Sequence, residues 1–347
     1  MSHTPRFGVL VLPNTAWSDI LQRSKHVEQL GFELVTTADH FCDWSDTSRD
    51  WHEGWSVLAA VAMATERVRI ATYVTQFPLR HPAMLARQAL TIDHISNGRL
   101  EIGLGTGIPI DPSYDMMGIP NWDGKERVVR FKEYVEVVDR LLSNEVSSFS
   151  GTYYTINDAI VKPRPIQQPR PPIVIAALGP VMLRFAARVA DTWDTMSFAQ
   201  TFAEQLADLR EKVKIVNETC AKAGRDPATL RRSYHMFDPA ARASSGRWMV
   251  SRLKCNTVED FQRRLIAETS PWRSIVSMHQ FSKLDVGDCG EIGFSWQGTA
   301  HPTDRVFNAT LLPGCTGIAK ERLDAEPIVL CELGAVVEGE GALEVGW

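Results

Sequence analysis

Two adjacent residues that can move protons, Asp39 and His40, directly follow an apolar and β-branched run at residues 32–38. A histidine accepts or donates a proton near neutral pH, and a neighbouring aspartate can orient its ring or cap the next turn. In barrels of parallel strands, catalytic groups lie at the C-terminal ends of the strands. The pair is therefore a candidate catalytic site, although the dipeptide alone also fits a turn aspartate beside a structural histidine.

Tryptophans occur in two loops that would lie near such a site. Trp44 follows His40 closely, and Trp122 lies in the long loop after a glycine-rich stretch at residues 103–107. Flat aromatic faces suit an apolar, planar ligand, so both are candidates for substrate contact. Each of them also fits a cover over the end of a hydrophobic core.

Two glycine-containing turns are candidates for close approach of a ligand to the backbone. The stretch 103–107 (Gly-Leu-Gly-Thr-Gly) is not a dinucleotide-binding fingerprint, because that motif needs glycine at position 108 or 110 and this chain has Ile108 and Ile110. The pair Gly179 and Pro180 opens a predicted helix, whose free N–H groups form a ready anion site. No cysteine or histidine spacing fits a metal site, so no metal is assigned.

The elements that would position these residues alternate along the chain. Short apolar runs are followed by segments of 3.6-residue period, the pattern of repeated βα units and a parallel sheet. The predicted strands cover residues 6–12, 32–38, 68–75, 99–104, 173–177, 192–196, 230–237 and 274–281. This count predicts a (β/α)8 TIM barrel over residues 1–281, although periodicity alone also fits a doubly wound sheet. Residues 282–347 are expected to be an irregular C-terminal extension, and whether they complete the barrel stays open.

Composition indicates small-molecule chemistry inside the cell. The chain has 347 residues, of which 44% are hydrophobic, enough for one large domain. Its net charge of -5 gives no basic field for nucleic acid or an anionic membrane. The apolar run near the N-terminus is too short for a signal or a membrane span, and the six cysteines form no CxxC pair. A cytoplasmic protein with a small-molecule substrate is expected.

A long ordered stretch resembles the luciferase-like monooxygenase family, which holds a flavin or a deazaflavin at the C-terminal mouth of its barrel. The resemblance is carried by residues 65–70 and 80–107, and continues through Gly-Thr-Tyr-Tyr at 151–154, a Pro-Arg-Pro connector and residues 187–193. It covers roughly residues 6–281. The family includes FMN-dependent monooxygenases and enzymes that use coenzyme F420, an 8-hydroxy-5-deazaflavin.

The resemblance implies positions for the cofactor. It places Asp39 and His40 beside the flavin or deazaflavin ring, and Tyr73-Val74 at a strand bulge behind the ring that often contains a non-prolyl cis peptide. Thr106 and Gly107 would line the ring edge.

The same resemblance implies contacts at the two ends of the cofactor site. The ribityl phosphate would meet Ala176, Ala177, Gly179 and Pro180. Trp44 matches a tryptophan found near the substrate in deazaflavin-using members.

One departure from the family bears on the substrate. In the sugar-phosphate dehydrogenase branch, an acidic residue follows Gly-Thr-Gly, whereas this chain has Ile108, and its nearest carboxylate is Asp111. We therefore expect the paired acid to be missing and the substrate not to be a sugar phosphate.

The resemblance favours an F420-dependent oxidoreductase that transfers a hydride between the deazaflavin and an apolar organic substrate. An FMN-dependent monooxygenase is the alternative, because reduced FMN activates oxygen readily and a reduced deazaflavin does not. A non-catalytic flavin-binding protein on the same fold is the second alternative. A separate flavin or F420 reductase and a homodimer stay open as partners.

Overall fold

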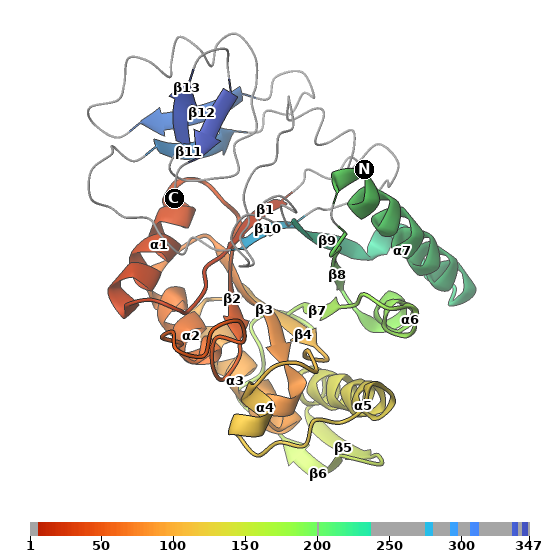
Figure 1. Cartoon of the computed structure of the whole chain (residues 1–347). Helices are drawn as coiled ribbons and strands as arrows, with labels where there is room; N and C mark the ends of the chain where they lie inside the picture. The colour runs from red at the N-terminus through yellow and green to blue at the C-terminus, as the bar shows by residue number, and fades with distance from the viewer. Residues whose placement is uncertain are drawn as a thin grey trace.

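The chain forms a curled parallel β-sheet with helices packed around it (Figure 1). The computed structural model describes residues 6–199, 201–236, 275–279, 292–297, 306–311, 335–338 and 342–345. The strands of the sheet are β1 Arg6–Leu10, β2 Leu34–Asp39, β3 Arg69–Gln76, β4 Leu100–Gly105, β7 Ile173–Ala176, β8 Thr192–Met196, β9 Arg231–Met236 and β10 Ile275–His279. These confirm the eight predicted strand segments, with ends that differ by a few residues.

The parallel sheet runs in the order β1-β10-β9-β8-β7-β4-β3-β2, and β1 pairs with β2 as well as with β10. Because all these strands are parallel, their C-terminal ends meet on one side. Loops that follow different strands therefore share one end of the sheet.

The helices of the described ranges lie mainly between consecutive strands. Their bounds are α1 Trp17–Gln29, α2 Gly54–Ala64, α3 Pro82–Ile95, α4 Ser113–Met116, α5 Gly124–Ser143, α6 Pro180–Val189 and α7 Phe202–Lys222, with the short 3₁₀ turns η1 Phe77–Leu79 and η2 Pro227–Thr229. Side-chain caps start several of them: Asp123 accepts from two N–H groups of α5, and Thr201 forms a capping box with Glu204 on α7. Helix α1 ends where the backbone becomes left-handed, at Gly31 with φ of 85°, whereas α2, α5 and α6 end in extended backbone.

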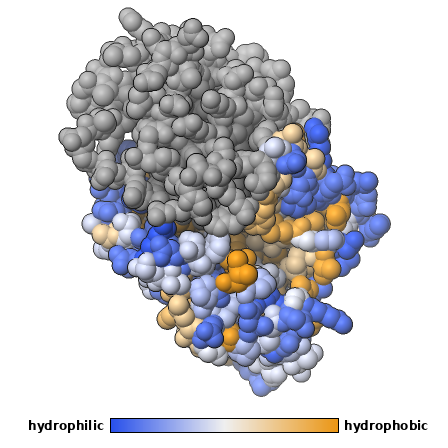
Figure 2. Space-filling model, in the orientation of Figure 1, coloured by the Kyte–Doolittle hydropathy of each residue, from blue (hydrophilic) through white to orange (hydrophobic). Residues whose placement is uncertain are grey.

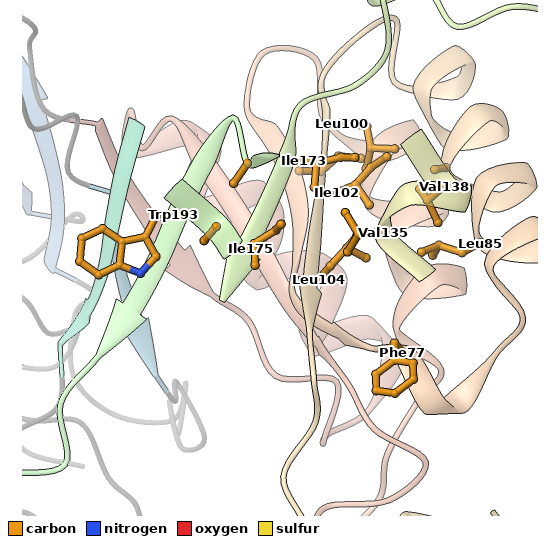
Figure 3. Packing of buried hydrophobic residues seen from close by; sticks show 14 of the residues in the cluster. Phe77, Leu85, Leu100, Ile102, Leu104, Val135, Val138, Ile173, Ile175 and Trp193 are labelled. Atoms are coloured by element: carbon orange, nitrogen blue, oxygen red, sulfur yellow. The ribbon is translucent and has the colours of Figure 1, made fainter. Parts of the chain in front are cut away.

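The main core lies between the strands and the helices (Figure 3). Ile102 and Leu104 of β4 point outward from the sheet and pack with Val135 and Val138 of α5. The alternate residues of the strands face the other side, where Leu34, Ala71, Tyr73 and Val174 form a separate cluster. The sheet thus has an inner face of its own.

Two features differ from the sequence-based expectation. The segment between α5 and β7 contains an antiparallel hairpin, β5 Val146–Ser150 and β6 Thr155–Ile160, which the sequence did not reveal. Its strands are largely exposed and polar, so they lack the apolar run on which the strand predictions relied.

The expectation of an irregular C-terminal extension is wrong for four segments. β11 Ile292–Gln297 pairs antiparallel with β12 Val306–Leu311, and β13 Ala335–Glu338 with β14 Ala342–Val345. In β11 the apolar residues alternate along the sequence, a strand pattern that is short and easily overlooked. The predicted boundary at residues 281–282 and a predicted helix near residues 257–265 lie outside the described residues. Of the helices that are described, none has the length and apolarity that a membrane crossing requires.

Candidate active site

A cavity of about 460 Å³ lies at the C-terminal ends of the parallel strands. Most of the residues predicted for the site line it: His40, Trp44, Tyr73, Val74, Thr106, Gly107, Ala176 and Gly179. Its walls are mainly apolar, and Figure 2 shows apolar side chains gathering around a hollow at the centre of that face. Residues from distant parts of the sequence therefore meet in one pocket, as expected for the ends of parallel strands.

Four of the predicted site residues do not line this cavity: Asp39, Ala177, Pro180 and Trp122. Trp122 stacks against Phe77, with ring centroids 5.8 Å apart, and the Arg130 guanidinium lies 4.3 Å from the Trp122 ring centre. The structure thus places Trp122 against the core beside α5, and substrate contact by this residue has no support from its position.

The strand bulge expected at Tyr73-Val74 is present. The peptide bond between these residues is cis, as the resemblance implied, and the pairing of β3 with β4 shifts register between Ala71 and Thr75. A β-carbon at Gly105 would lie only 2.4 Å from Cγ2 of Val74. Glycine at this position therefore lets the Val74 side chain lie across β4 at the floor of the cavity.

His40 is held by an aspartate from another loop. Nδ1 of His40 lies 2.6 Å from Oδ2 of Asp111, and Nε2 of Gln76 donates to the same oxygen at 2.6 Å. Burial raises the pKa of Asp111, but the hydrogen bond and charge of His40 and bonds from Ser113 and Gln76 lower it to about 2. Asp111 is therefore an anion at neutral pH and favours the tautomer in which Nδ1 carries the proton. Nε2 is left to exchange a proton with a ligand.

The position of Asp111 corrects the expectation that the paired acid is missing. After Gly107, residues 108–111 form a turn in which the Asp111 amide donates to the Ile108 carbonyl at 3.1 Å. The Ser113 amide donates to Oδ1 of Asp111 at 2.8 Å and fixes the carboxylate at the start of α4. An acid three positions beyond Ile108 thus reaches the histidine, because the loop folds back on itself.

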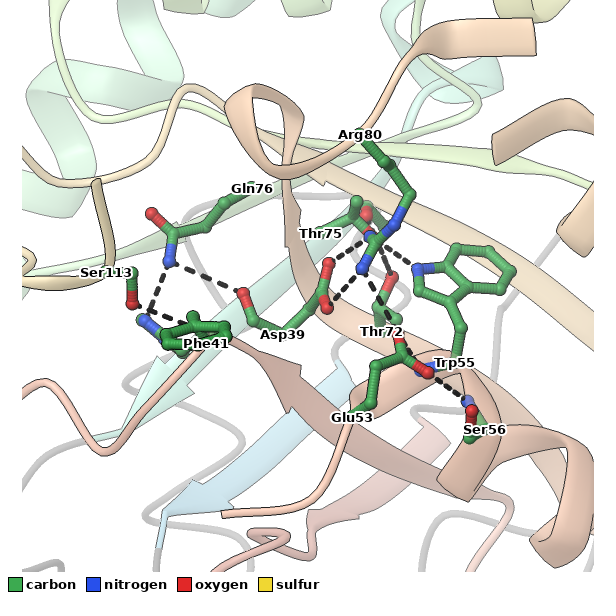
Figure 4. A network of polar contacts seen from close by, with 12 residues as sticks. Asp39, Phe41, Glu53, Trp55, Ser56, Thr72, Thr75, Gln76, Arg80 and Ser113 are labelled. Carbon is green, nitrogen blue, oxygen red and sulfur yellow. Dashed lines mark hydrogen bonds and ion pairs between the residues drawn. The ribbon is translucent and has the colours of Figure 1, made fainter. Parts of the chain in front are cut away.

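Asp39 does not orient the His40 ring, which corrects the first expectation for this pair. Its carboxylate forms a two-point ion pair with Arg80, and Arg80 also donates to Glu53 at 3.1 Å (Figure 4). Side chains of consecutive residues in a strand point to opposite faces of the sheet, so the side chains of Asp39 and His40 point away from each other. Burial raises the pKa of Asp39, and the Arg80 contacts oppose this. Asp39 anchors the end of β2, from which His40 extends.

Two further residues of this network were not found from the sequence. The Tyr114 hydroxyl donates to Oε1 of Gln76, which leaves the Gln76 amide group to donate to Asp111 and to the Asp39 backbone carbonyl. Gly107 has φ of 73°, and a β-carbon there would lie 2.0 Å from the Tyr114 oxygen. Neither Gln76 nor Tyr114 belongs to a recognisable sequence motif. Only their hydrogen bonds in the folded chain place them in this network.

The start of α6 forms one edge of the cavity. Gly179 is its N-terminal cap and offers no side chain to the first N–H groups, while Pro180 takes the first helical position. Arg184 donates back to the Pro180 carbonyl at 3.3 Å. A β-carbon at Gly179 would meet no atom within 4 Å, so the space above these N–H groups is open. Such a helix start favours an anion.

The remaining lining shows which charges a ligand would meet. Within the described ranges, no lysine or arginine lines the cavity, and its ionisable residues are His40, Asp43, Tyr73, Asp194 and His235. No group of three potential metal ligands occurs in that part of the chain. Ile110, Leu178 and Phe198 line the cavity and remain 76%, 40% and 48% exposed, so its rim is apolar.

Comparisons with known proteins agree with this architecture. The family model described as luciferase-like monooxygenase matches residues 1–246. An F420-dependent glucose-6-phosphate dehydrogenase of Beutenbergia cavernae is 35% identical over 174 residues, which is 50% of this chain and 51% of that protein. An F420-dependent hydroxymycolic acid dehydrogenase of Mycobacterium tuberculosis is 27% identical over 74% of this chain and 70% of its own length. The chain thus spans about half the length of the first of these relatives.

Solved structures show the same fold. An F420-dependent secondary alcohol dehydrogenase in complex with an F420-acetone adduct superposes with a TM-score of 0.61 at 22% identity, over 67% of this chain and 69% of that one. The coenzyme F420-dependent tetrahydromethanopterin reductase of Methanopyrus kandleri gives a TM-score of 0.58 at 26% identity, over 68% and 66%. Because the family model matches well over half of the sequence, the chain belongs to the luciferase-like monooxygenase family.

Proposed function

We propose that this protein is an F420-dependent oxidoreductase that transfers a hydride between the deazaflavin and an apolar organic substrate. The observation that carries the proposal is the His40–Asp111 pair at the wall of a largely apolar cavity. The names of the relatives and of the structural neighbours support F420 as the cofactor. A non-catalytic flavin-binding protein has no need of such a pair.

The residues present fit a deazaflavin. Tyr73, Val74, Thr106 and Gly107 provide a mainly apolar floor and edge for a planar ring. The uncapped start of α6 at Gly179, with open space above it, suits the phosphate. Asp39 and Ala177 would act from behind the lining, since Asp39 anchors β2 and Ala177 is buried in the core.

A bound deazaflavin supplies a carbon centre that accepts or donates a hydride. The chain itself would manage the proton. Nε2 of His40 would accept the proton from the oxygen of a substrate alcohol that is being oxidised, and would return a proton to the oxygen of a carbonyl that is being reduced. Asp111 stabilises the imidazolium that forms and keeps the ring oriented, as in other histidine–carboxylate pairs.

The cavity favours an uncharged substrate. The argument from Ile108 against a sugar phosphate no longer holds, because Asp111 supplies the acid. The lining described here nevertheless has no cation for a substrate phosphate, and the rim at Ile110, Leu178 and Phe198 is apolar. The proposed substrate therefore carries an alcohol or carbonyl group on an apolar body, and it differs from the sugar phosphate named for several relatives.

The proposal also covers the domain organisation, the cellular location and the partners of the protein. We propose a complete (β/α)8 barrel over residues 1–281, followed by an extension at 282–347. Cytoplasmic location, a homodimer, and a separate reductase that supplies reduced F420 accompany it as expectations.

Purified protein tested separately with F420 and FMN decides the cofactor. Quenching of F420 fluorescence should give saturable binding in the micromolar range or tighter. Submicromolar FMN binding without measurable F420 affinity would replace the proposal by the FMN-dependent monooxygenase. Tight binding of either cofactor by a protein that turns over neither alcohols, carbonyls nor oxygen would favour the flavin-binding protein.

A further inference from the structure

A second pair of polar residues, Asp194 and His235, lines the same cavity and takes no part in the His40 network. They extend from β8 and β9, which lie side by side with Asp194 paired to Ser233 and Met196 paired to His235. Trp193 and Tyr234, the residues before them, belong to the outer core. Strand alternation therefore turns Asp194 and His235 to the inner face of the sheet.

Both side chains are buried, and part of their hydrogen-bonding capacity is unused within the described part of the chain. Asp194 is 1% exposed and His235 is 4% exposed. Nε2 of His235 lies 3.2 Å from Oδ2 of Asp194 without the geometry of a hydrogen bond, and Oδ1 of Asp194 and Nε2 of His235 have no hydrogen-bond partner among the described residues. Buried carboxylate oxygens are almost always hydrogen-bonded, so an oxygen of this kind at a cavity wall is available to a hydrogen-bond donor on a ligand.

The pair lies on the side of the cavity where the strand bulge is found. The His235 ring packs on the Tyr73 ring, with centroids 5.1 Å apart and an angle of 31° between their planes. Tyr73 carries the cis peptide to Val74, and both residues line the cavity floor. A planar ligand on this bulge would place one edge near Asp194. An ionised carboxylate only accepts hydrogen bonds, so it selects a donor on that edge.

We propose that Asp194, positioned by His235, accepts a hydrogen bond from an N–H or O–H group on the ring of the bound cofactor. The inference rests on the proposed function, because it assumes that F420 occupies this cavity. Asp194 then binds one edge of the ring, while the His40–Asp111 pair exchanges the proton with the substrate. His235 is a positioning residue that fixes the direction of the carboxylate.

Binding of F420 to Asp194→Asn tests the proposal without any assay of turnover. The substitution keeps the shape of the side chain and removes its charge. A hydrogen bond to an ionised group contributes enough that its loss should weaken F420 binding by about tenfold or more in a fluorescence titration. The thermal midpoint of the cofactor-free protein should stay the same or rise, because an unsatisfied buried carboxylate has been removed.

A second carboxylate on the cavity wall provides the matched control. Oδ1 of Asp43 already accepts from the Ser45 amide at 2.9 Å and from the Ser45 hydroxyl at 2.6 Å, and Oδ2 accepts from Arg49 at 3.4 Å, so both oxygens have partners within the chain. Asp43→Asn should leave F420 affinity within about threefold of wild type, since no ligand bond is lost. For the positioning role, His235→Leu should weaken binding, and His235→Gln, which keeps a polar N–H group beside Asp194, should restore most of it.

The outcomes separate this inference from the proposed function. If wild type binds F420 and Asp194→Asn binds it equally well, Asp194 does not contact the cofactor and the inference is wrong while the proposed function stands. If wild type does not bind F420, both are wrong. A fall in cofactor-free stability with unchanged affinity would show that Asp194 is a structural residue.

Discussion

Replacement of Gly179 by valine separates cofactor binding from folding. Gly179 has φ of -91°, which valine adopts readily, and a β-carbon there would meet no atom within 4 Å. The cofactor-free protein should therefore lose little stability. Valine is a poorer N-cap than glycine, and this effect amounts to about 1 kcal/mol or less.

The effect on the complex follows from what the open space is expected to hold. An anion at the start of α6 would accept hydrogen bonds from the first backbone N–H groups, and two valine methyl groups would displace it. Loss of one such charge-assisted bond is on the order of 1 to 3 kcal/mol. This corresponds to a rise in the dissociation constant for F420 of roughly 5- to 150-fold.

Two measurements and one control variant complete this test. Fluorescence titration gives the F420 dissociation constant, and thermal melts with and without F420 show whether the loss appears only in the complex. Gly124→Val provides the control, because Gly124 also opens a helix, has open space around it, and does not line the cavity. Equal F420 affinity in Gly179→Val and wild type would refute the phosphate site at α6.

Three further predictions concern the charged groups. His40→Ala should lower turnover by roughly 100-fold and change F420 affinity much less; steady-state kinetics within a few-fold of wild type would make His40 structural. Asp111→Asn should lower kcat, since it removes the anion that orients the His40 ring and stabilises the imidazolium that forms on proton transfer; a kcat within a few-fold of wild type would contradict this pairing. Burial raises the pKa of Glu101, but the charges of Arg6 and Arg69 lower it from 4.5 to about 2. The ionised carboxylate therefore stabilises the fold above pH 4.5, and this stabilisation is lost as the pH falls toward 2. Glu101→Gln should therefore reduce the free energy of unfolding at pH 7 by about 3 kcal/mol and flatten its pH dependence between about pH 5 and 2, as measured by denaturant titration; a full acid transition in the variant would refute it.

The strands could be predicted because each one is a local property of the chain. A buried parallel strand needs a short run of apolar and β-branched residues, and β7 (Ile-Val-Ile-Ala) shows such a run plainly. The β5–β6 hairpin is mostly solvent-exposed, so its sequence carries no apolar run. Sequence patterns thus revealed the strands that are buried on folding, but they did not reveal the strands that pair in solvent.

The candidate site was only partly predictable because its contacts join distant segments. One dipeptide identified Asp39 and His40 as candidates. The sequence did not show that Asp39 pairs with Arg80 and that His40 pairs with Asp111. The true pairing of His40 spans 71 residues and depends on the turn at residues 108–111. The family resemblance indicated the bulge at Tyr73-Val74, but Asp194 and His235 have no motif and emerge only where β8 and β9 meet.

The displaced acid also shows why chemistry here is better judged by distance than by alignment. Ile108 occupies the position that holds an acidic residue in the sugar-phosphate dehydrogenase branch, and on alignment alone the histidine would lack a partner. The loop instead brings Asp111 to 2.6 Å, and the Ser113 amide and Gln76 hold it there. A carboxylate needs only contact with Nδ1 to stabilise the imidazolium, whichever position of the loop supplies it. The exchange also places the apolar Ile108 and Ile110 on the cavity wall, so the loop can keep the proton-transfer pair while making the pocket more apolar.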